Sequence, residues 1–300
     1  MHAQPKQAQP LAIGIDIGGT NVRAACVDAS GRIVEHVAER TSRDAQALLA
    51  RLVAMVQQLD RPDVASIGIG VPGRVDARRG RVLSGGYVDL SAISLVDAIG
   101  GQTGKPVLVD NDCNMALTAE IAVGAARGSR QVAMLTIGTG IGGALALDGA
   151  VLRGLRSAGQ LGHVTVEAGG LPCNCGRRGC VETTSSGTAL GRHIAEAGLP
   201  ADSTADSVLA LAHQGDERAI HVLRAWAGPL RAAIDSIVAA FDPELFLLGG
   251  GLGQAACAAL EWAPALSPWY QCPVRPATLG DDAGVIGAAL AGARQDMLVS

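Results

Sequence analysis

The distribution of apolar positions predicts a mixed α/β protein. Residues 11–16 are almost continuously apolar and predict a buried strand, and residues 22–28 and 33–41 predict two more strands joined by short turns. Residues 44–59 carry apolar side chains at helical spacing, which indicates an amphipathic helix. A strand over 64–70, a loop, and alternating helices and strands follow. The first half therefore predicts three antiparallel strands leading into α/β units.

The second half repeats this layout. Residues 13–34 ("IGIDIGGTNVRAACVDASGRIV") and 133–152 ("AMLTIGTGIGGALALDGAVL") share an apolar strand, a Gly/Thr turn, a second apolar strand, an Asp, a Gly and a third strand. Long helices are expected over about 204–241, and a final helix from Ala283. A duplicated α/β unit predicts two similar lobes with a cleft between them.

The lobe boundaries follow from the same pattern. Residues 1–10 are polar and rich in Pro and Gln, so we expect a disordered lead there. We expect residues 11–118, together with a C-terminal helix over 284–300, to form a small N-terminal lobe. Residues 119–283 would form a large C-terminal lobe that carries a cysteine-rich loop at 163–182. No low-complexity linker separates the halves, so helices should join them.

Composition and charge exclude several classes of protein. Aromatic residues make up 2% of the 300 residues, so Ala, Val, Leu and Ile must build the core. A formal net charge of −4 gives no electrostatic reason to expect nucleic acid or an anionic membrane as a partner. The longest uncharged run, residues 132–147, is too short to span a bilayer. A cytoplasmic protein is the expectation.

Three similar glycine-rich turns, each following an apolar strand, indicate an anion-binding site. They are "DIGGTNVR" (16–23), "TIGTGIGG" (136–143) and "LLGGGLG" (247–253). Backbone without side chains allows N–H groups to approach an anion closely, and Thr20 and Thr139 add hydroxyl donors. A dinucleotide-binding turn is excluded because no helix follows the G-x-G-x-x-G matches, and "GQTGKP" lacks the hydroxyl of a P-loop. The three turns together are typical of a nucleotide cradle.

A cluster of metal-binding residue types lies in the predicted loop. His163, Cys173, Cys175 and Cys180 offer one imidazole and three thiolates, a complete tetrahedral set for a structural Zn²⁺. A DNA-binding finger would need a helix between its ligand pairs, and none fits here. Seven cysteines in a reducing compartment argue against a disulfide framework. Buried free thiols remain the alternative.

The order of these motifs gives the chain a family resemblance. Residues 16–23 and 136–143 resemble the two phosphate loops of the actin-like (sugar kinase/Hsp70) superfamily. The segments "DNDCNMALTAE", "GQLGHVTV", "CNCGRRGCVE" and "DDAGVIGAAL" resemble successive signatures of the ROK family. The match runs from about Leu11 to the last helix. It implies an α/β fold of two ribonuclease-H-like lobes with a cleft between them.

The resemblance also implies an activity. ROK members include sugar kinases and transcriptional repressors, and the repressors carry an additional N-terminal helix-turn-helix, for which a strand starting at Leu11 leaves no room. We therefore expect ATP-dependent phosphorylation of a hexose or N-acetylhexosamine hydroxyl, at the 6-position, with Mg·ATP, structural zinc and a homodimeric state. The alternative is a non-catalytic sugar-sensing ROK protein without a DNA-binding domain, which would need neither a base nor phosphate turns.

Site residues follow from the resemblance as expectations. Asp112 would be the general base, although Asp110 lies close by and an Asp before a helix is also typical of an N-cap. The residues implied for sugar binding are Gly73, Asn111, Asp112, Gln160, His163 and Glu182. The residues implied for nucleotide and phosphate binding are Asp16, Gly18, Gly19, Thr20, Asn21, Arg23, Gly138, Thr139, Gly140, Gly249, Gly250 and Gly251.

One position departs from the family pattern. The usual sequence is Glu-x-Gly-His, whereas this chain has "QLGH" with Gln160. An amide both accepts and donates hydrogen bonds, whereas a carboxylate only accepts them. This substitution favours an N-acetylhexosamine over plain glucose. The segment "ETTSSGTAL" after the cysteine loop is glucokinase-like, so glucokinase and N-acetylmannosamine or N-acetylglucosamine kinase both stay open.

Overall fold

The computed structural model describes residues 10–265, 267–269 and 271–294, and it divides the chain into two compact units. Unit 1 comprises Met1–Val123, Arg153–Ala158 and Asp282–Ser300. Unit 2 comprises Gly124–Leu152 and Gly159–Asp281. The expected disordered lead lies outside the described residues except for Pro10, as do residues 295–300 of the expected C-terminal helix. The expected lobe boundaries stay a prediction.

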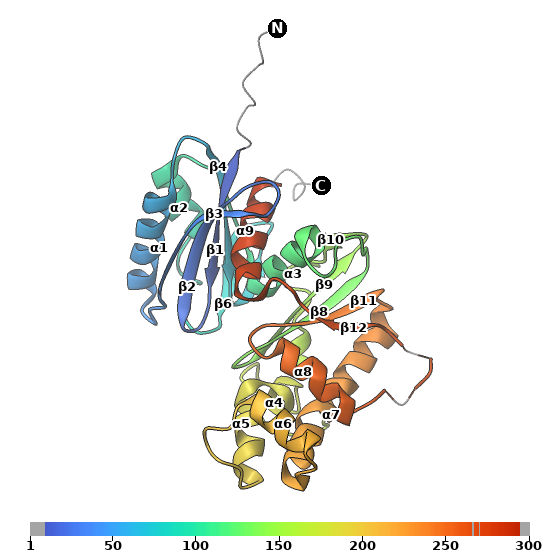
Figure 1. Ribbon diagram of the computed structural model, residues 1–300. Coiled ribbons are helices and arrows are strands. Elements are labelled where there is room, and N and C mark those ends of the chain that lie inside the picture. The colour runs from blue at the N-terminus through green and yellow to red at the C-terminus, as the bar shows by residue number, and fades with distance from the viewer. Residues whose placement is uncertain (1–9, 266, 270, 295–300) are drawn as a thin grey trace. The chain divides into compact units, whose positions relative to one another are not determined.

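Unit 1 is built on a five-stranded sheet of order β3-β2-β1-β4-β7 (Figure 1). The first three strands pair antiparallel, and β4 and β7 add in parallel to β1 and to β4. The three antiparallel strands agree with the prediction from the sequence. The elements of unit 1 are β1 (Leu11–Ile17), β2 (Asn21–Val27), β3 (Ile33–Arg40), α1 (Ala45–Leu59), β4 (Val64–Val71), β5 (Gly73–Asp76), β6 (Arg81–Gly85), α2 (Leu95–Thr103), β7 (Val107–Asn111), α3 (Asp112–Val123) and α9 (Ala283–Ala293).

The two faces of this sheet are packed in different ways. Ile13, Ile15 and Ile17 all point to one face of the sheet, because every second side chain of a strand lies on the same face. They pack there in a core shared with α1. On the other face α9 runs along the sheet (Figure 1), and Gly14 and Gly68 let its backbone approach closely. A Cβ on Gly14 would lie 1.8 Å from the carbonyl oxygen of Val285. At these two glycines no side chain separates the helix from the strands.

The segment between β4 and α2 differs from the sequence prediction. It contains a two-stranded antiparallel hairpin, β5 and β6, where a loop was expected. Gly73, the first residue of β5, has a φ of +98°, and a Cβ there would lie 2.3 Å from the carbonyl oxygen of Ser84. Glycine is thus required at the position that opens the hairpin.

Unit 2 repeats the architecture of unit 1. Its five-stranded sheet has the order β10-β9-β8-β11-β12, with two antiparallel pairs followed by two parallel pairs. The duplication and the α/β class are therefore confirmed. The elements of unit 2 are β8 (Val132–Ile137), β9 (Ile141–Leu147), β10 (Ala150–Val151), η1 (Leu161–His163), α4 (Glu182–Ser185), α5 (Gly187–Glu196), α6 (Ala205–His213), α7 (Glu217–Phe241), β11 (Leu245–Gly249), α8 (Gly253–Ala259), η2 (Leu260–Trp262), β12 (Val274–Pro276) and η3 (Gly280–Asp282).

The core of unit 2 anchors the helices that follow the cysteine loop. Trp226, in the middle of α7, is fully buried, and its Nε1 donates to the backbone oxygen of Ser186, 3.0 Å away. Ser185 donates in turn to the backbone oxygen of Trp226 at 2.7 Å. These buried hydrogen bonds fix the start of α5 against α7.

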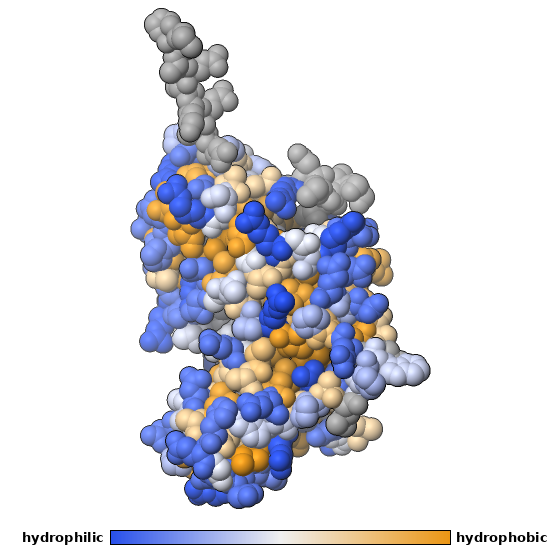
Figure 2. Space-filling model, turned by 45° about the vertical axis from the view of Figure 1, so that its right-hand side comes forward, coloured by the Kyte–Doolittle hydropathy of each residue, from blue (hydrophilic) through white to orange (hydrophobic). Residues whose placement is uncertain are grey.

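The surface is mixed in character. Figure 2 shows hydrophilic residues over much of one face, with hydrophobic areas between them. Among the described residues, Leu155 and Trp269 are the most exposed of the large hydrophobic side chains. In the part of the chain that the structure describes, no helix combines the length and apolarity that crossing a membrane requires.

The contact between α9 and the sheet generates a stability prediction. Gly14→Ala should lower the free energy of unfolding by at least about 2 kcal/mol, because backbone must move to admit the methyl group. Gly101→Ala is the matched control, since Gly101 lies inside α2 with no atom within 4 Å of an added Cβ. It should stabilise by about 0.5–1 kcal/mol. Urea unfolding followed by circular dichroism measures both, and equal effects would contradict the packing described.

Candidate active site

The first glycine turn joins β1 to β2, and hydrogen bonds from a residue outside the turn stabilise its shape. Gly18 donates from its backbone N–H to the carbonyl of Asn21 at 3.0 Å, which closes the turn. Thr41, beyond the end of β3, donates from its hydroxyl to the carbonyl of Gly18 at 2.7 Å and from its N–H to that of Thr20 at 2.9 Å. Gly19 and Thr20 themselves are exposed. The turn is thus shaped by its neighbours while its tip faces outward.

Asp16 lies at the end of β1, beside this turn. The strand register places it opposite Arg23, so the two side chains lie on the same face of the sheet. Gly284, in the first turn of α9, leaves space for it: a Cβ there would lie 2.5 Å from the carboxyl carbon of Asp16. The last helix therefore makes room for a carboxylate next to the first glycine turn.

The junction of β7 and α3 holds the candidate base. Asn111 is the helix cap, because its Oδ1 accepts from the backbone N–H groups of Cys113 and Asn114 at 3.0 and 3.3 Å. Asp112 is the first residue of the helix, so the interpretation of Asp112 as a simple N-cap is wrong. The Asn111 amide donates to Oδ1 of Asp112 at 2.8 Å and to the carbonyl of Gly73 at 2.9 Å. Gly73, Asn111 and Asp112 thus lie together.

The electrostatic environment makes Asp112 a stronger base than an ordinary carboxylate. Burial raises its pKa from 3.8 to about 6, against the opposing effect of hydrogen bonds from Cys113 and Asn111. A carboxyl group with this pKa is mostly ionised at neutral pH yet binds a proton more readily than an exposed Asp. Raised carboxyl pKa values of this kind are typical of proton-transfer groups.

The second and third glycine turns lie side by side in unit 2. Leu252, within the third turn, donates from its N–H to the carbonyl of Ile137, the residue before Gly138, at 3.0 Å. Gly250 has a φ of +76°, and a Cβ there would lie 2.5 Å from that same carbonyl oxygen. Thr188, at the start of α5, donates from its hydroxyl to the carbonyl of Thr139 at 2.8 Å. The fold therefore brings both turns of this unit together.

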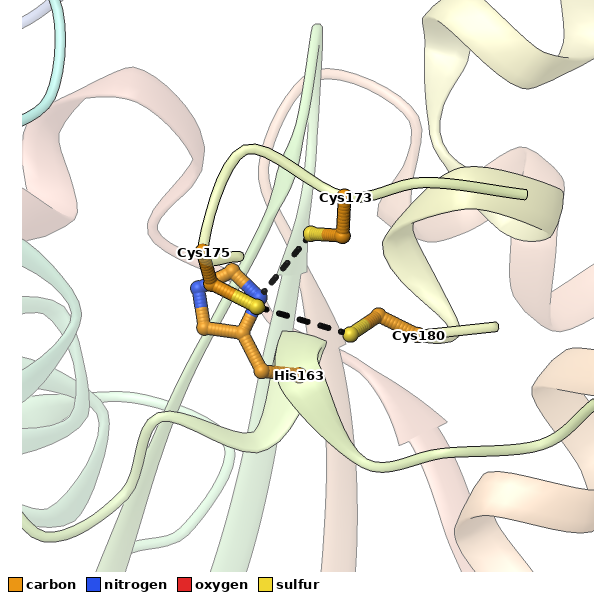
Figure 3. Close-up of side chains that lie close together, drawn as sticks. All are labelled: His163, Cys173, Cys175 and Cys180. Atoms are coloured by element: carbon orange, nitrogen blue, oxygen red, sulfur yellow. Dashed lines mark hydrogen bonds between the residues drawn. The ribbon is translucent and has the colours of Figure 1, made fainter. Parts of the chain in front are cut away.

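The four metal-ligand candidates converge in unit 2 (Figure 3). Their ligand atoms all lie within 4.8 Å of one another. Cys173 Sγ is 3.6 Å from His163 Nδ1, and Cys175 Sγ is 3.7 Å from Cys180 Sγ. Gly176 and Gly179 have φ values of +87° and +69°, so the loop makes tight turns at two positions that favour glycine. The loop folds so that the three sulfur atoms and the imidazole point toward one another (Figure 3).

These distances fit a tetrahedral metal site. Zn–S bonds of about 2.3 Å place two thiolates about 3.8 Å apart at the corners of a tetrahedron, and a nitrogen ligand comes slightly closer. The distances of 3.6 and 3.7 Å agree with that geometry. Burial raises the pKa of the Cys180 thiol to about 12, with the neighbouring thiols adding to the shift. A divalent cation would stabilise the thiolate that this environment disfavours.

Glu182 connects the cysteine loop to the second glycine turn. Its Oε2 accepts from the backbone N–H of Ile141 at 2.9 Å, immediately after Gly140. Its Oε1 lies 3.7 Å from Cys173 Sγ. A Cβ on Gly140 would lie 2.6 Å from Oε2. Glycine at this position therefore leaves room for the Glu182 carboxylate beside the turn. The role expected from the sequence, sugar binding, stays a prediction for Glu182.

Gln160 and His163 are placed by the short helix η1. Gly162, between them, packs on β9 so closely that a Cβ would lie 1.9 Å from the carbonyl oxygen of Ile141. His163 turns Nδ1 toward Cys173, and its Nε2 is therefore the ring nitrogen on the opposite edge (Figure 3). Arg177 donates to the backbone oxygen of His163 at 3.2 Å and holds the loop to this helix.

The expected site residues thus form two sets. Unit 1 carries the first glycine turn, Asp16, Arg23, Gly73, Asn111 and Asp112, and unit 2 carries the other two turns, Gln160, Glu182 and the four metal-ligand candidates. Sequence reasoning missed the supporting residues Thr41 and Thr188. Thr41 directly follows β3 and Thr188 lies at the start of α5, and no motif marks either hydroxyl.

Comparison with known proteins agrees with this geometry. The duplicated sheets and glycine turns define the actin-like ATPase class of fold. A family model described as the ROK family matches residues 12–294. The chain belongs to the ROK family, which confirms the resemblance found in the sequence.

Individual relatives cover nearly the whole chain. The glucokinase of Halalkalibacterium halodurans is 33% identical over 305 aligned residues, covering 92% of each chain. The N-acetylmannosamine kinase of Yersinia pseudotuberculosis is 34% identical over 292 residues, covering 93% of this chain and 97% of its own. A ROK family glucokinase from Streptomyces griseus, solved with glucose and AMPPNP, is 31% identical with a TM-score of 0.80, covering 95% of this chain and 99% of its own.

Proposed function

We propose that this chain transfers the γ-phosphoryl group of ATP to the 6-hydroxyl of a hexose or N-acetylhexosamine. The chain is an enzyme of the sugar-kinase class. The observation that carries the proposal is Asp112, a carboxylate with a raised pKa that Asn111 orients at the end of β7. A protein that only senses sugar would need no such base.

Asp112 acts as the general base. Its carboxylate accepts the proton of the sugar hydroxyl while that oxygen attacks the γ-phosphorus, and the bond to the β-phosphate oxygen breaks. A pKa of about 6 keeps the group ionised at neutral pH and still basic enough to take the proton. Asn111 holds one carboxylate oxygen, which restricts the rotation of the group.

The glycine turns bind the nucleotide phosphates. Exposed backbone N–H groups and the hydroxyls of Thr20 and Thr139 would donate to phosphate oxygens, and residues 249–251 would lie against the adenosine. Asp16 would hold Mg²⁺, directly or through water; this oxygen donor suits a hard cation. Mg²⁺ would neutralise charge on the transferred group.

Further sugar-binding groups are part of the proposal. Gln160, Glu182 and the Nε2 edge of His163 would bind sugar hydroxyls, as would Gly73 and Asn111. We also propose that the metal is Zn²⁺, because three sulfurs and one imidazole nitrogen at these distances suit it. Its role is structural: it fixes the loop that positions His163 and Glu182.

Replacement of the base tests the proposal. Asp112→Asn should lower kcat by roughly 10²–10⁴, the usual contribution of a positioned base. Wild-type kcat should fall as the pH drops below about 6, because the carboxylate takes up a proton there. Asp148→Asn, on an exposed ion pair in a different region, is the control and should leave kcat unchanged. An Asp112→Asn variant with more than a tenth of wild-type turnover would show that another group is the base.

Metal content tests the zinc proposal. Purified protein should contain one zinc per chain by elemental analysis, and Cys175→Ser should lose most of it. The variant should also melt at a lower temperature, because structural zinc contributes on the order of 10–16 kcal/mol of apparent binding free energy at neutral pH. Cys257→Ser, a half-buried thiol outside the loop, is the control. Zinc-free wild-type protein isolated without chelators would contradict the proposal.

The choice of sugar is tested at Gln160. We propose that an N-acetylhexosamine is preferred, since the amide can donate to an acetyl carbonyl. Gln160→Glu should improve kcat/KM for glucose relative to N-acetylmannosamine by roughly fivefold or more, because hydrogen bonds to a charged group are stronger by about 1 kcal/mol. If the wild type already prefers glucose and the ratio does not change in the variant, Gln160 carries no specificity.

A further inference from the structure

One short segment belongs to unit 1 although the chain on both sides of it belongs to unit 2. Residues Arg153–Ala158 group with unit 1, whereas Leu152 and Gly159 group with unit 2. The segment follows β10 and ends just before Gln160. These six residues are therefore part of unit 1, and their contacts with other residues of unit 1 can be described within that unit.

Arg153, the first residue of this segment, forms an ion pair with Asp110. Its Nε donates to Oδ2 of Asp110 at 2.6 Å. The Asp110 side chain is 2% exposed and that of Arg153 is 20% exposed, so the ion pair is largely shielded from water. A second contact, from Arg74 Nε to Ser157 Oγ at 3.2 Å, is exposed. Of these two contacts, the one between Arg153 and Asp110 involves a buried carboxylate.

Asp110 is connected to Asp112 by hydrogen bonds through Asn111. Its Oδ1 accepts from the backbone N–H of Asn111 at 2.7 Å and from the amide of Asn114 at 2.9 Å. Asn111 in turn caps α3 and donates to Asp112. Each group in the chain from Arg153 to Asp112 is thus fixed by a hydrogen bond to the next.

We propose that Arg153 is a positioning residue for phosphoryl transfer, acting through Asp110 and Asn111 on the base Asp112. The inference rests on the proposed function, because it assigns Arg153 a role in that reaction. A buried carboxylate is stabilised by a cationic partner, and without Arg153 the Asp110 side chain would rotate toward other donors. That rotation removes an acceptor from the backbone N–H of Asn111 and loosens the orientation of Asp112.

The test separates orientation of the base from stability. Arg153→Gln should lower kcat about tenfold or more, since a misplacement of about 1 Å remote from the chemistry can cost on the order of 100-fold. KM for ATP should stay within about twofold, because the glycine turns are untouched. Asp110→Asn/Arg153→Gln removes both charges and should recover at least about fivefold of the lost kcat, since no buried charge is left unpaired.

Ser157→Ala is the matched control. It removes the exposed contact of the same segment and should leave kcat unchanged. Zinc content and melting temperature, measured on every variant, report folding. If Arg153→Gln does not fold, Arg153→Lys replaces it, keeping the charge without the guanidinium geometry, and should lose at least about threefold in kcat.

Three outcomes would overturn the inference. One is a folded Arg153 variant with kcat within twofold of wild type. Another is a double variant no better than the single variant. The third is a Ser157→Ala variant that loses as much kcat as the Arg153 variant. Wild-type protein without sugar-dependent ATP turnover would instead overturn the proposed function itself.

Discussion

A turn that binds an anion with its backbone has no side chains with which to hold its own shape, and this constraint explains many of the contacts around the candidate site. Glycine is the most flexible residue, so such turns must be fixed by their neighbours. Thr41 fixes the first turn, and Thr188 fixes the second. The third turn packs on the backbone at Ile137. Backbone N–H groups are thereby held ready for a ligand before it binds.

The cysteine loop extends the same principle. Glu182, two residues after Cys180, accepts from the backbone N–H of Ile141 at the end of the second turn. Gly162, next to His163, rests on the carbonyl of that same residue. Residues next to both ends of the metal-ligand set therefore contact Ile141, the first residue of β9. A structural metal held by these ligands would help to fix both Glu182 and the start of β9.

Periodicity and spacing predicted most of the architecture, and they failed where contacts depend on distant residues. The strands around the first two glycine turns follow from apolar runs, and the metal-ligand set follows from the spacing of His163 and the cysteines. The β5–β6 hairpin was missed because its charged sequence has no apolar alternation. Asn111 and Asp112 are both good cap residues, so only the geometry separates their roles. The pair of Arg153 and Asp110 joins residues 43 positions apart, which no local pattern reveals.

The central claim is that this chain moves a phosphoryl group from ATP to a sugar hydroxyl. The most direct measurement is phosphorus nuclear magnetic resonance of the purified protein with Mg·ATP and each of a panel of hexoses and N-acetylhexosamines. The account predicts ADP and a sugar phosphate in equal amounts with at least one sugar, and no comparable ATP consumption without sugar. Tight binding of sugar and ATP without any sugar phosphate would contradict it.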